Sequence, residues 1–344
     1  MKVSHLLTIP PPTLEIDLER LPLGHGPTPV RALPGLPGEA PVWVKEDGCY
    51  GPHGGNKARK LEWLLAAARR RGKRWLISGG ALGTNHGLAT ALYGREAGFR
   101  TVLVLVPQPL DAYVRAQLGR MRATGAELHF AGGPARAFAL AATLMVRRTG
   151  PRGRLPYLIL PGGSVPLGCV GYVEAGLELA RQVAAGEAPE PSHVVVALGS
   201  GGTAAGLLLG MKAAGLRSRL VCVLVNDITP VSARSVARLA RRTQRLLRRR
   251  GAGLPRVAIS AADVEVRDEW LGGGYGHRTD AGASATETFA ARDVVLDPVY
   301  TAKAGAALLE LNRRGELGAG PVLFWNTYSA PAAPGDQAAH GGRP

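Results

Sequence analysis

The stretch HVVVALGSGGTAAG, residues 193–206, decides the fold class of this chain. Its first part, His193–Leu198, is an apolar, β-branched run that predicts a buried strand, and the small residues after the turn begin a helix. The turn between them is rich in glycine, so its amides are free to face a ligand at the N-terminus of the helix. The hydroxyls of Ser200 and Thr203 add polar groups. This combination predicts a phosphate-binding turn in an α/β protein.

The same alternation of strand and helix continues along the chain. Apolar runs predict strands at Trp75–Ser78, Thr101–Val106, Glu127–Phe130, Tyr157–Leu160, His193–Leu198, Leu220–Val225, Val294–Leu296 and Val322–Trp325. Helical patterns predict helices near residues 57–71, 86–98, 111–124, 135–148, 168–184, 203–214, 230–250 and 302–314. Strands this apolar, separated by helices, are typical of parallel sheets that are buried on both faces. The predicted fold class is therefore α/β.

Composition excludes several classes of protein. The chain has 344 residues, of which 46% are hydrophobic, and this fraction excludes a disordered chain. The 47 Gly and 26 Pro exclude a long coiled coil. A formal net charge of +16 raises the question of nucleic acid, but the one dense basic run, Arg234–Arg250, has apolar residues at helical spacing. We interpret it as a solvated amphipathic helix, so nucleic acid is not an expected partner.

No segment of the sequence predicts export or a membrane span. A signal-peptide core is missing before Pro10–Pro12, and no apolar run reaches about 18 residues. The cysteines, Cys49, Cys169 and Cys222, are odd in number and far apart, and the chain has no C-x-x-C or H-E-x-x-H motif. We therefore expect a cytoplasmic protein with no membrane contact, no disulfide framework and no common zinc site.

Two further glycine-rich turns precede predicted helices. In residues 54–62, GGNKARKLE, two glycines come before a helix that opens on Lys57. A lysine at a helix start inside a cleft has a lowered pKa and suits Schiff-base chemistry, although a solvated surface lysine is also compatible with this stretch. In residues 78–87, SGGALGTNHG, Thr84 and Asn85 are expected to cap the next helix and could bind a carboxylate there.

A dinucleotide-binding site is the main alternative for the turn after residue 198. Gly199-x-Gly201-x-x-Ala204 fits the loose dinucleotide fingerprint, and Asp227 closes the next strand. However, Asp227 lies 28 residues after Gly199 instead of about 20, and an NAD(P)-dependent oxidoreductase would leave the other two turns without a role.

Taken in order, these turns resemble the pyridoxal-phosphate enzymes of the 1-aminocyclopropane-1-carboxylate deaminase and D-cysteine desulfhydrase family. The resemblance runs from about Val44 to about Ala306. Its motifs are Lys45-Glu46-Asp47, Gly54-Gly55-Asn56-Lys57-x-Arg59-Lys60-Leu61-Glu62, Thr84-Asn85-His86, Pro161-Gly162-Gly163-Ser164-x-Pro166-Leu167-Gly168, the loop Gly199–Gly206, and Asp297-Pro298-Val299-Tyr300-Thr301-x-Lys303.

The resemblance implies the fold-type II architecture, like that of the tryptophan synthase β subunit. It has two open, twisted, mostly parallel sheets flanked by helices, with the cofactor in the cleft between domains. A larger cofactor-binding domain would comprise residues 1–59 and 161–330, and a smaller domain, residues 60–160, would close over the site. Residues 331–344 are expected to form a disordered tail. Family members are commonly homodimers, so a homodimer is expected.

The resemblance also implies roles for individual residues. Lys57 would form the Schiff base with pyridoxal 5′-phosphate and move the Cα proton. Asn85, or less favourably Asn56, would hydrogen-bond the cofactor 3′-oxygen. The phosphate would lie against Gly199, Ser200, Gly201, Gly202 and Thr203. The substrate carboxylate would be held by Thr84, Asn85 and His86. Tyr275 and Tyr300, with Thr84, would be further catalytic residues, and Thr301 would lie near the pyridine nitrogen.

Two positions favour one branch of this family. The deaminases carry Glu after the second tyrosine and Gln after the Asn of the second turn, whereas this chain has Thr301 and His86, as in the desulfhydrases. A neutral partner makes the pyridine ring a weaker electron sink, which is sufficient when a β-leaving group departs at once. We predict a lyase that converts a small amino acid with a β-leaving group, foremost D-cysteine, to pyruvate, sulfide and ammonia. A deaminase, another β-eliminating or β-replacing enzyme, or a non-catalytic, nucleic-acid-binding relative are the alternatives.

Overall fold

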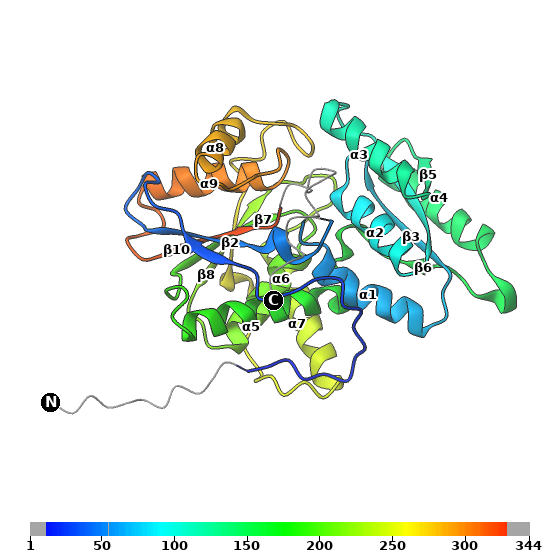
Figure 1. Cartoon of the computed structure of the whole chain (residues 1–344), viewed down its shortest axis with the longest axis horizontal. Coiled ribbons are helices and arrows are strands. Elements are labelled where there is room, and N and C mark those ends of the chain that lie inside the picture. The colour runs from blue at the N-terminus through cyan, green and yellow to red at the C-terminus, as the bar shows by residue number, and fades with distance from the viewer. Residues whose placement is uncertain (1–11, 54, 329–344) are drawn as a thin grey trace, which may run out of the picture.

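The computed structural model describes residues 12–53 and 55–328 (Figure 1). Its strands are β1 (Val30–Ala32), β2 (Val42–Glu46), β3 (Trp75–Ala81), β4 (Arg100–Val106), β5 (Glu127–Phe130), β6 (Tyr157–Leu158), β7 (His193–Leu198), β8 (Arg219–Leu224), β9 (Val264–Arg267) and β10 (Val322–Asn326). Its helices are α1 (Ala58–Arg70), α2 (Asn85–Glu96), α3 (Ala112–Ala123), α4 (Pro134–Arg147), α5 (Pro166–Ala184), α6 (Gly202–Ala213), α7 (Ala233–Arg249), α8 (Asp280–Ala290) and α9 (Thr301–Arg313). The predicted α/β class is confirmed.

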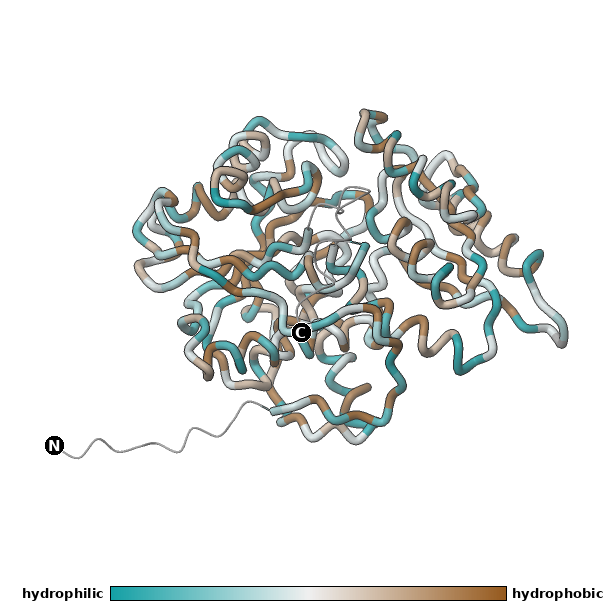
Figure 2. The backbone as a smooth tube through the Cα atoms, viewed as in Figure 1, coloured by the Kyte–Doolittle hydropathy of each residue, from teal (hydrophilic) through white to brown (hydrophobic). Residues whose placement is uncertain are grey.

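The larger sheet has six strands in the order β1-β2-β10-β7-β8-β9. All neighbours are parallel except β1 and β2, which form an antiparallel pair at one edge. One face packs against α5, α6 and α7, and the opposite face packs against α8 and α9 (Figure 1). The central strands are therefore buried on both faces and appear as continuous hydrophobic segments inside the molecule (Figure 2).

The smaller sheet is entirely parallel, in the order β5-β4-β3-β6, and takes all its strands from residues 75–158. Helix α2 covers one of its faces with the help of α1 and α3, and α4 covers the other. Helix α1 also packs against α5 of the larger sheet, so it joins the two sheets (Figure 1). The carboxyl ends of β3 and β7 thereby face a common cleft.

Five elements differ from the sequence prediction. Residues 294–296 form no strand. Val294 and Leu296 are instead buried in the apolar cluster that packs against α9, so their hydrophobicity reflects core burial without a strand partner. Strands β1, β2 and β9 and helix α8 were not predicted. Strand β2 pairs with β10, whose paired residues lie 280 positions later, and such a distant partner leaves no local signal in a proline-rich segment.

The basic run forms helix α7 as predicted. Ser232 begins the helix with a capping box, and one face, including Val236, Ala240 and Leu247, is buried against α5 and α6. The arginines occupy the other face, which is the arrangement of an amphipathic surface helix. None of the described helices is long and apolar enough to cross a membrane. The predicted tail, residues 331–344, lies outside the described residues.

Candidate active site

One large cavity brings the three glycine-rich turns together. It has a volume of about 630 Å³ and lies where β3 and β7 end, which is where open α/β sheets bind ligands. The sequence-predicted residues that line it are Asn56, Lys57, Thr84, Asn85, His86, Gly199, Ser200, Gly201, Gly202, Thr203, Tyr275 and Tyr300. Thr301 is the one predicted site residue that does not line this cavity.

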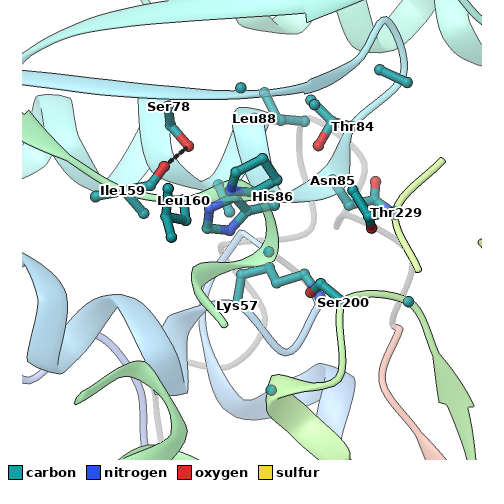
Figure 3. Close-up of a pocket in the computed structure, with 18 of the residues that line it drawn as sticks. Lys57, Ser78, Thr84, Asn85, His86, Leu88, Ile159, Leu160, Ser200 and Thr229 are labelled. Atoms are coloured by element: carbon teal, nitrogen blue, oxygen red, sulfur yellow. Dashed lines mark hydrogen bonds between the residues drawn. The ribbon is translucent and has the colours of Figure 1, made fainter. Parts of the chain in front are cut away.

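Lys57 lies immediately before α1, and its side chain extends toward the turn that carries Ser200 (Figure 3). Its amine makes no hydrogen bond within residues 12–53 and 55–328. Burial lowers the pKa of Lys57 to about 8, although the negative charges of Asp297 and Asp47 partly offset this effect. A substantial fraction of Lys57 is therefore neutral near pH 8, as a nucleophilic amine requires.

A buried network of charges fixes the segment that carries Lys57. Arg59, two residues later, donates to Asp47 at 2.7 Å and to Glu178 at 3.1 Å. The hydroxyl of Tyr172 also donates to Asp47, at 2.7 Å. Because these groups are buried, each charge must be paired, and the pairing gives the start of α1 a defined position.

A second lysine, Lys60, lies one helical turn after Lys57 and also lines the cavity. Its Nζ donates to the backbone oxygen of Gly162 at 3.0 Å. Burial, together with the nearby charge of Lys57, lowers the pKa of Lys60 to about 7. Sequence analysis assigned Lys60 no role, although its spacing of three residues from Lys57 places both on one helix face. An anion between the two amines would favour their charged forms.

The turn after β7, which is predicted to bind a phosphate, lies at the N-terminus of α6 and lines the cavity. Gly201 adopts a positive φ of 83°, and α6 begins at Gly202. A Cβ atom at Gly202 would lie 2.5 Å from the Ser164 hydroxyl and 2.9 Å from Lys60 Nζ, so only glycine leaves room there. Ser164 was not predicted as a site residue. Its hydroxyl accepts a hydrogen bond from the Gly202 amide at 3.0 Å and lies 2.7 Å from the Ser200 hydroxyl.

The turn after β3 caps α2, as predicted for Thr84. Its Oγ1 accepts a hydrogen bond from the Gly87 amide at 3.2 Å. Asn85 is the first residue of α2, and its Oδ1 accepts hydrogen bonds from two side chains of α3. Both residues line the cavity, where the N-terminus of α2 favours an anion.

His86 is buried in the wall of the cavity, close to Leu160 and above Lys57 (Figure 3). Neither ring nitrogen has a hydrogen-bond partner among the described residues. Burial, with the charges of Lys57 and Lys60, holds the pKa of His86 well below its usual range, although the nearby Leu160 backbone, outside full hydrogen-bond geometry, acts in the opposite direction. A buried, neutral imidazole without partners is costly, so this ring is a polar group that a bound ligand can satisfy.

Tyr275 and Tyr300 both line the cavity and contact each other. Their hydroxyl oxygens lie 2.5 Å apart. Burial raises the pKa of Tyr275 to about 12 and raises the pKa of Tyr300 still further because Tyr275 adds to the effect of burial there. Both phenols are therefore protonated at neutral pH and can hold or donate a proton.

Thr301 is fully buried beside Asp297. Its Oγ1 accepts a hydrogen bond from the Asp297 amide at 2.7 Å, and Asp297 itself lines the cavity. The predicted contact between Thr301 and a pyridine nitrogen therefore stays a prediction. Asp297 was not predicted as a site residue, and its buried carboxylate has a raised pKa because of desolvation, opposed by hydrogen bonds from the backbone of residues 299–301.

The residues present fit pyridoxal phosphate. The turn at Gly202, with Lys60, forms a cradle for a phosphate. Lys57 supplies an amine of lowered pKa within the same cavity, and His86 leaves buried polar atoms unsatisfied. These three features, an anion site, a reactive amine and unmet hydrogen bonds, are the chemical requirements for holding this aldehyde and its phosphate.

Comparison with known proteins agrees with this geometry. A family model described as "Pyridoxal-phosphate dependent enzyme" matches residues 21–327. Proteins named D-cysteine desulfhydrase from Salmonella choleraesuis (strain SC-B67) and Salmonella paratyphi C (strain RKS4594) are each 33% identical over 343 residues, which covers 96% of this chain and 98% of theirs.

Solved structures show the same fold. A structure described as an ACC deaminase homologue superimposes with a TM-score of 0.76 at 32% identity, covering 91% of this chain and 92% of that one. A hydrogen sulfide-producing enzyme from Fusobacterium nucleatum has a TM-score of 0.60 at 15% identity, covering 90% and 96%, and shares the fold alone. The predicted fold-type II architecture is thus confirmed, and this chain belongs to the family of pyridoxal-phosphate-dependent enzymes.

Proposed function

We propose that this enzyme eliminates the β-substituent from a small amino acid, with D-cysteine as its main substrate. D-Cysteine and water give pyruvate, hydrogen sulfide and ammonia, so atoms balance without an oxidant. The observation that supports this proposal best is the placement of the Lys57 amine and the Tyr275–Tyr300 hydroxyl pair around one cavity. Proton removal needs a base and support of the leaving group needs an acid, and both kinds of group line this cavity.

Pyridoxal phosphate, when bound, supplies the electron sink that makes the Cα proton removable. The turn at 199–203 and Lys60 would hold its phosphate. Lys57, whose pKa is lowered to about 8 by burial, moves the Cα proton. Thr84, the backbone amide of Asn85 and His86 hold the substrate carboxylate at the start of α2, which leaves the Asn85 side chain for the cofactor. The protonated phenol of Tyr300, supported by Tyr275, supplies a proton to the departing sulfur.

The choice of D-cysteine rests on two lines of support. Relatives that align with nearly the whole chain carry the name D-cysteine desulfhydrase. In addition, Thr301 is a neutral residue at the position where the deaminases have Glu. A deaminase that opens 1-aminocyclopropane-1-carboxylate, or another β-eliminating or β-replacing enzyme, is the second candidate, which the neighbouring ACC deaminase homologue structure motivates.

The dinucleotide interpretation of Gly199–Ala204 is wrong, because the chain belongs to a pyridoxal-phosphate family. The structure also gives Asp227 a different role, since its Oδ1 accepts a hydrogen bond from the Tyr275 amide at 2.9 Å. Asp227 therefore helps to place an active-site tyrosine instead of binding a ribose.

The absorbance spectrum followed by a substrate panel tests the proposal. Purified protein with pyridoxal phosphate is expected to absorb in the violet, and borohydride or Lys57→Ala is expected to abolish that band. D-Cysteine, L-cysteine, D-serine, β-chloro-D-alanine and 1-aminocyclopropane-1-carboxylate are then compared by release of 2-oxo acid and sulfide. Turnover of the cyclopropane substrate without turnover of D-cysteine would transfer the assignment to the deaminase.

Assembly and closure are part of the same proposal. We expect a homodimer in the cytoplasm and expect the unit around the smaller sheet, predicted as residues 60–160, to close over the substrate. Light scattering of the purified enzyme checks the first expectation. Small-angle scattering with and without a slow substrate checks the second, because closure reduces the radius of gyration.

A further inference from the structure

A chain of hydrogen bonds runs along one face of α3 and ends on Asn85. Tyr113, Gln117 and Arg120 are spaced by four and three residues, so they share this face. Arg120 donates to Gln117 Oε1 at 3.2 Å, and Gln117 Nε2 donates to Asn85 Oδ1 at 2.6 Å. The Tyr113 hydroxyl accepts from Gln117 Nε2 at 3.2 Å and donates to Asn85 Oδ1 at 2.8 Å.

Arg120 fixes the direction of these hydrogen bonds. A guanidinium only donates hydrogen bonds, so the oxygen of the Gln117 amide must face Arg120 and its nitrogen must face Asn85. The Asn85 oxygen is then the acceptor of two hydrogen bonds. Gln117 is buried, which strengthens its hydrogen bonds to Asn85 and Arg120, and both Gln117 and Arg120 line the cavity.

This arrangement leaves the Nδ2 atom of the Asn85 amide without a role in the contact with α3. Its oxygen is directed to α3, so its Nδ2 is the group left for a ligand, and Asn85 lines the cavity that contains Lys57. We propose that Arg120, Gln117 and Tyr113 are positioning residues that fix Asn85 as a hydrogen-bond donor toward the cofactor 3′-oxygen. This inference rests on the proposed function, because it requires pyridoxal phosphate in the cavity.

The expected effect is electrostatic. A donor beside the 3′-oxygen stabilises its anionic form, whereas an amide oxygen in the same place would repel that anion. A hydrogen bond to a charged group changes its pKa by about one unit, so the orientation of Asn85 is measurable in the pH titration of the absorbance of the bound cofactor.

The Gln117→Glu variant of the holoenzyme is expected to reverse the direction of the hydrogen bond to Asn85, because the two side chains have almost the same shape. A carboxylate at residue 117 accepts from Arg120 and also from the Asn85 nitrogen, so the Asn85 oxygen turns to the cavity. We expect the midpoint of the spectral titration to rise by about one pH unit. Tyr113→Phe leaves the donor from Gln117 in place, so its midpoint is expected to shift less.

The control is Ala116→Glu, which adds the same charge on the exposed face of α3, next to Gln117. An unchanged midpoint in Gln117→Glu, or an equal shift in Ala116→Glu, overturns the inference. If Gln117→Glu does not fold, a crystal structure of the wild-type holoenzyme decides: Asn85 Nδ2 at hydrogen-bond distance from the 3′-oxygen supports the inference, and any other arrangement overturns it.

Failure of the proposed function gives a different result. In that case the wild-type protein shows no violet absorbance with pyridoxal phosphate, and the variants have no titration to compare. A coloured, active wild type with an unshifted Gln117→Glu variant rejects the positioning role alone.

Discussion

The hydroxyl oxygens of Tyr275 and Tyr300 lie 2.5 Å apart, although the two residues belong to different segments of the chain. Tyr300 immediately precedes α9, and Tyr275 lies in the loop before α8. This loop is held from both sides, since Lys303 donates to the backbone oxygens of Leu271 and Gly274, and Asp227 accepts from the Tyr275 amide. The two phenols therefore form one proton-holding unit at a fixed position.

Removing either hydroxyl is expected to impair elimination. We expect Tyr300→Phe to lower kcat by about 10²- to 10⁴-fold, the usual contribution of a positioned acid or base. Tyr275→Phe should lower kcat less than Tyr300→Phe does. The kcat of the double variant should be only slightly below that of Tyr300→Phe, because the two phenols act as a unit. Steady-state kinetics with D-cysteine measures this. Tyr157→Phe, on β6 and outside the cavity lining, is the control, and additive losses would contradict the prediction.

The lowered pKa of Lys57 predicts how cofactor capture depends on pH. Only the neutral amine reacts with the aldehyde, and its fraction grows as pH rises and levels off above the pKa of about 8. The rate at which apoprotein takes up pyridoxal phosphate, followed by stopped-flow absorbance, should therefore reach a plateau above pH 8–9. An ordinary lysine, with a pKa of about 10.4, would show a rate that still increases at pH 10.

Asp297→Asn is the matched variant for this measurement. The negative charge of Asp297 raises the pKa of Lys57, so its removal should move the midpoint of the capture rate to lower pH. If the midpoint of the capture rate in Asp297→Asn moves to higher pH, the predicted electrostatic effect of Asp297 on Lys57 is contradicted.

The buried charges behind Lys57 predict a stability effect. Glu178 binds Lys45 at 2.5 Å and Arg59 at 3.1 Å. Glu178→Gln leaves two buried cations with too few partners and is expected to lower the free energy of unfolding by about 3–5 kcal/mol. Urea denaturation measures the change. Glu190→Gln removes an exposed pair with Arg217 and should cost less than about 1 kcal/mol.

The same network gives a pH dependence. Burial acts to raise the pKa of Glu178, but Arg59 and Lys45 outweigh burial, so the pKa in the folded protein lies below the usual value of 4.5. Glu178 therefore contributes stability above about pH 4.5, and this contribution is lost as pH falls through the folded-state pKa. The wild type should lose more stability on acidification from pH 5 than Glu178→Gln does.

Thr84 caps α2 and also lines the cavity. Thr84→Ala removes the acceptor for the Gly87 amide and should lower the free energy of unfolding by about 1 kcal/mol. Thr84→Ser keeps the hydroxyl and should retain most of that stability and most of the activity. Thermal unfolding and the KM for D-cysteine check both variants. Equal stability of the Ala and Ser variants would show that the cap contributes nothing.

Most of the fold could be predicted from local sequence patterns. The strands β3, β4, β7, β8 and β10 are apolar runs between helices, and the structure has each of them within a few residues of the predicted bounds. The short edge elements could not be predicted. Strands β1 and β9 lie at the two edges of the larger sheet and gain their strand character from one neighbour each, so their composition is hardly constrained.

Sequence analysis found those cavity residues that belong to a local motif, such as a glycine-rich turn or a helix cap. Lys57 follows glycines, Thr84 caps a helix, and residues 199–203 form a turn between a strand and a helix, so each leaves a signal in consecutive residues. Lys60, Ser164 and Gln117 left no comparable signal, because their roles depend on what other segments bring near them. Ser164, for example, acts on Gly202, 38 residues away.

The sequence by itself determined the α/β class, the three glycine-rich turns and the place of Lys57 at the start of a helix, because these follow from hydrophobic periodicity and from backbone conformations that only certain residues adopt. Only the tertiary structure decided how the turns meet in one cavity, which amines lose their charge, and which way the Asn85 amide faces. Those properties depend on burial and on partners distant in the chain, and desolvation and hydrogen bonding act through space instead of along the sequence.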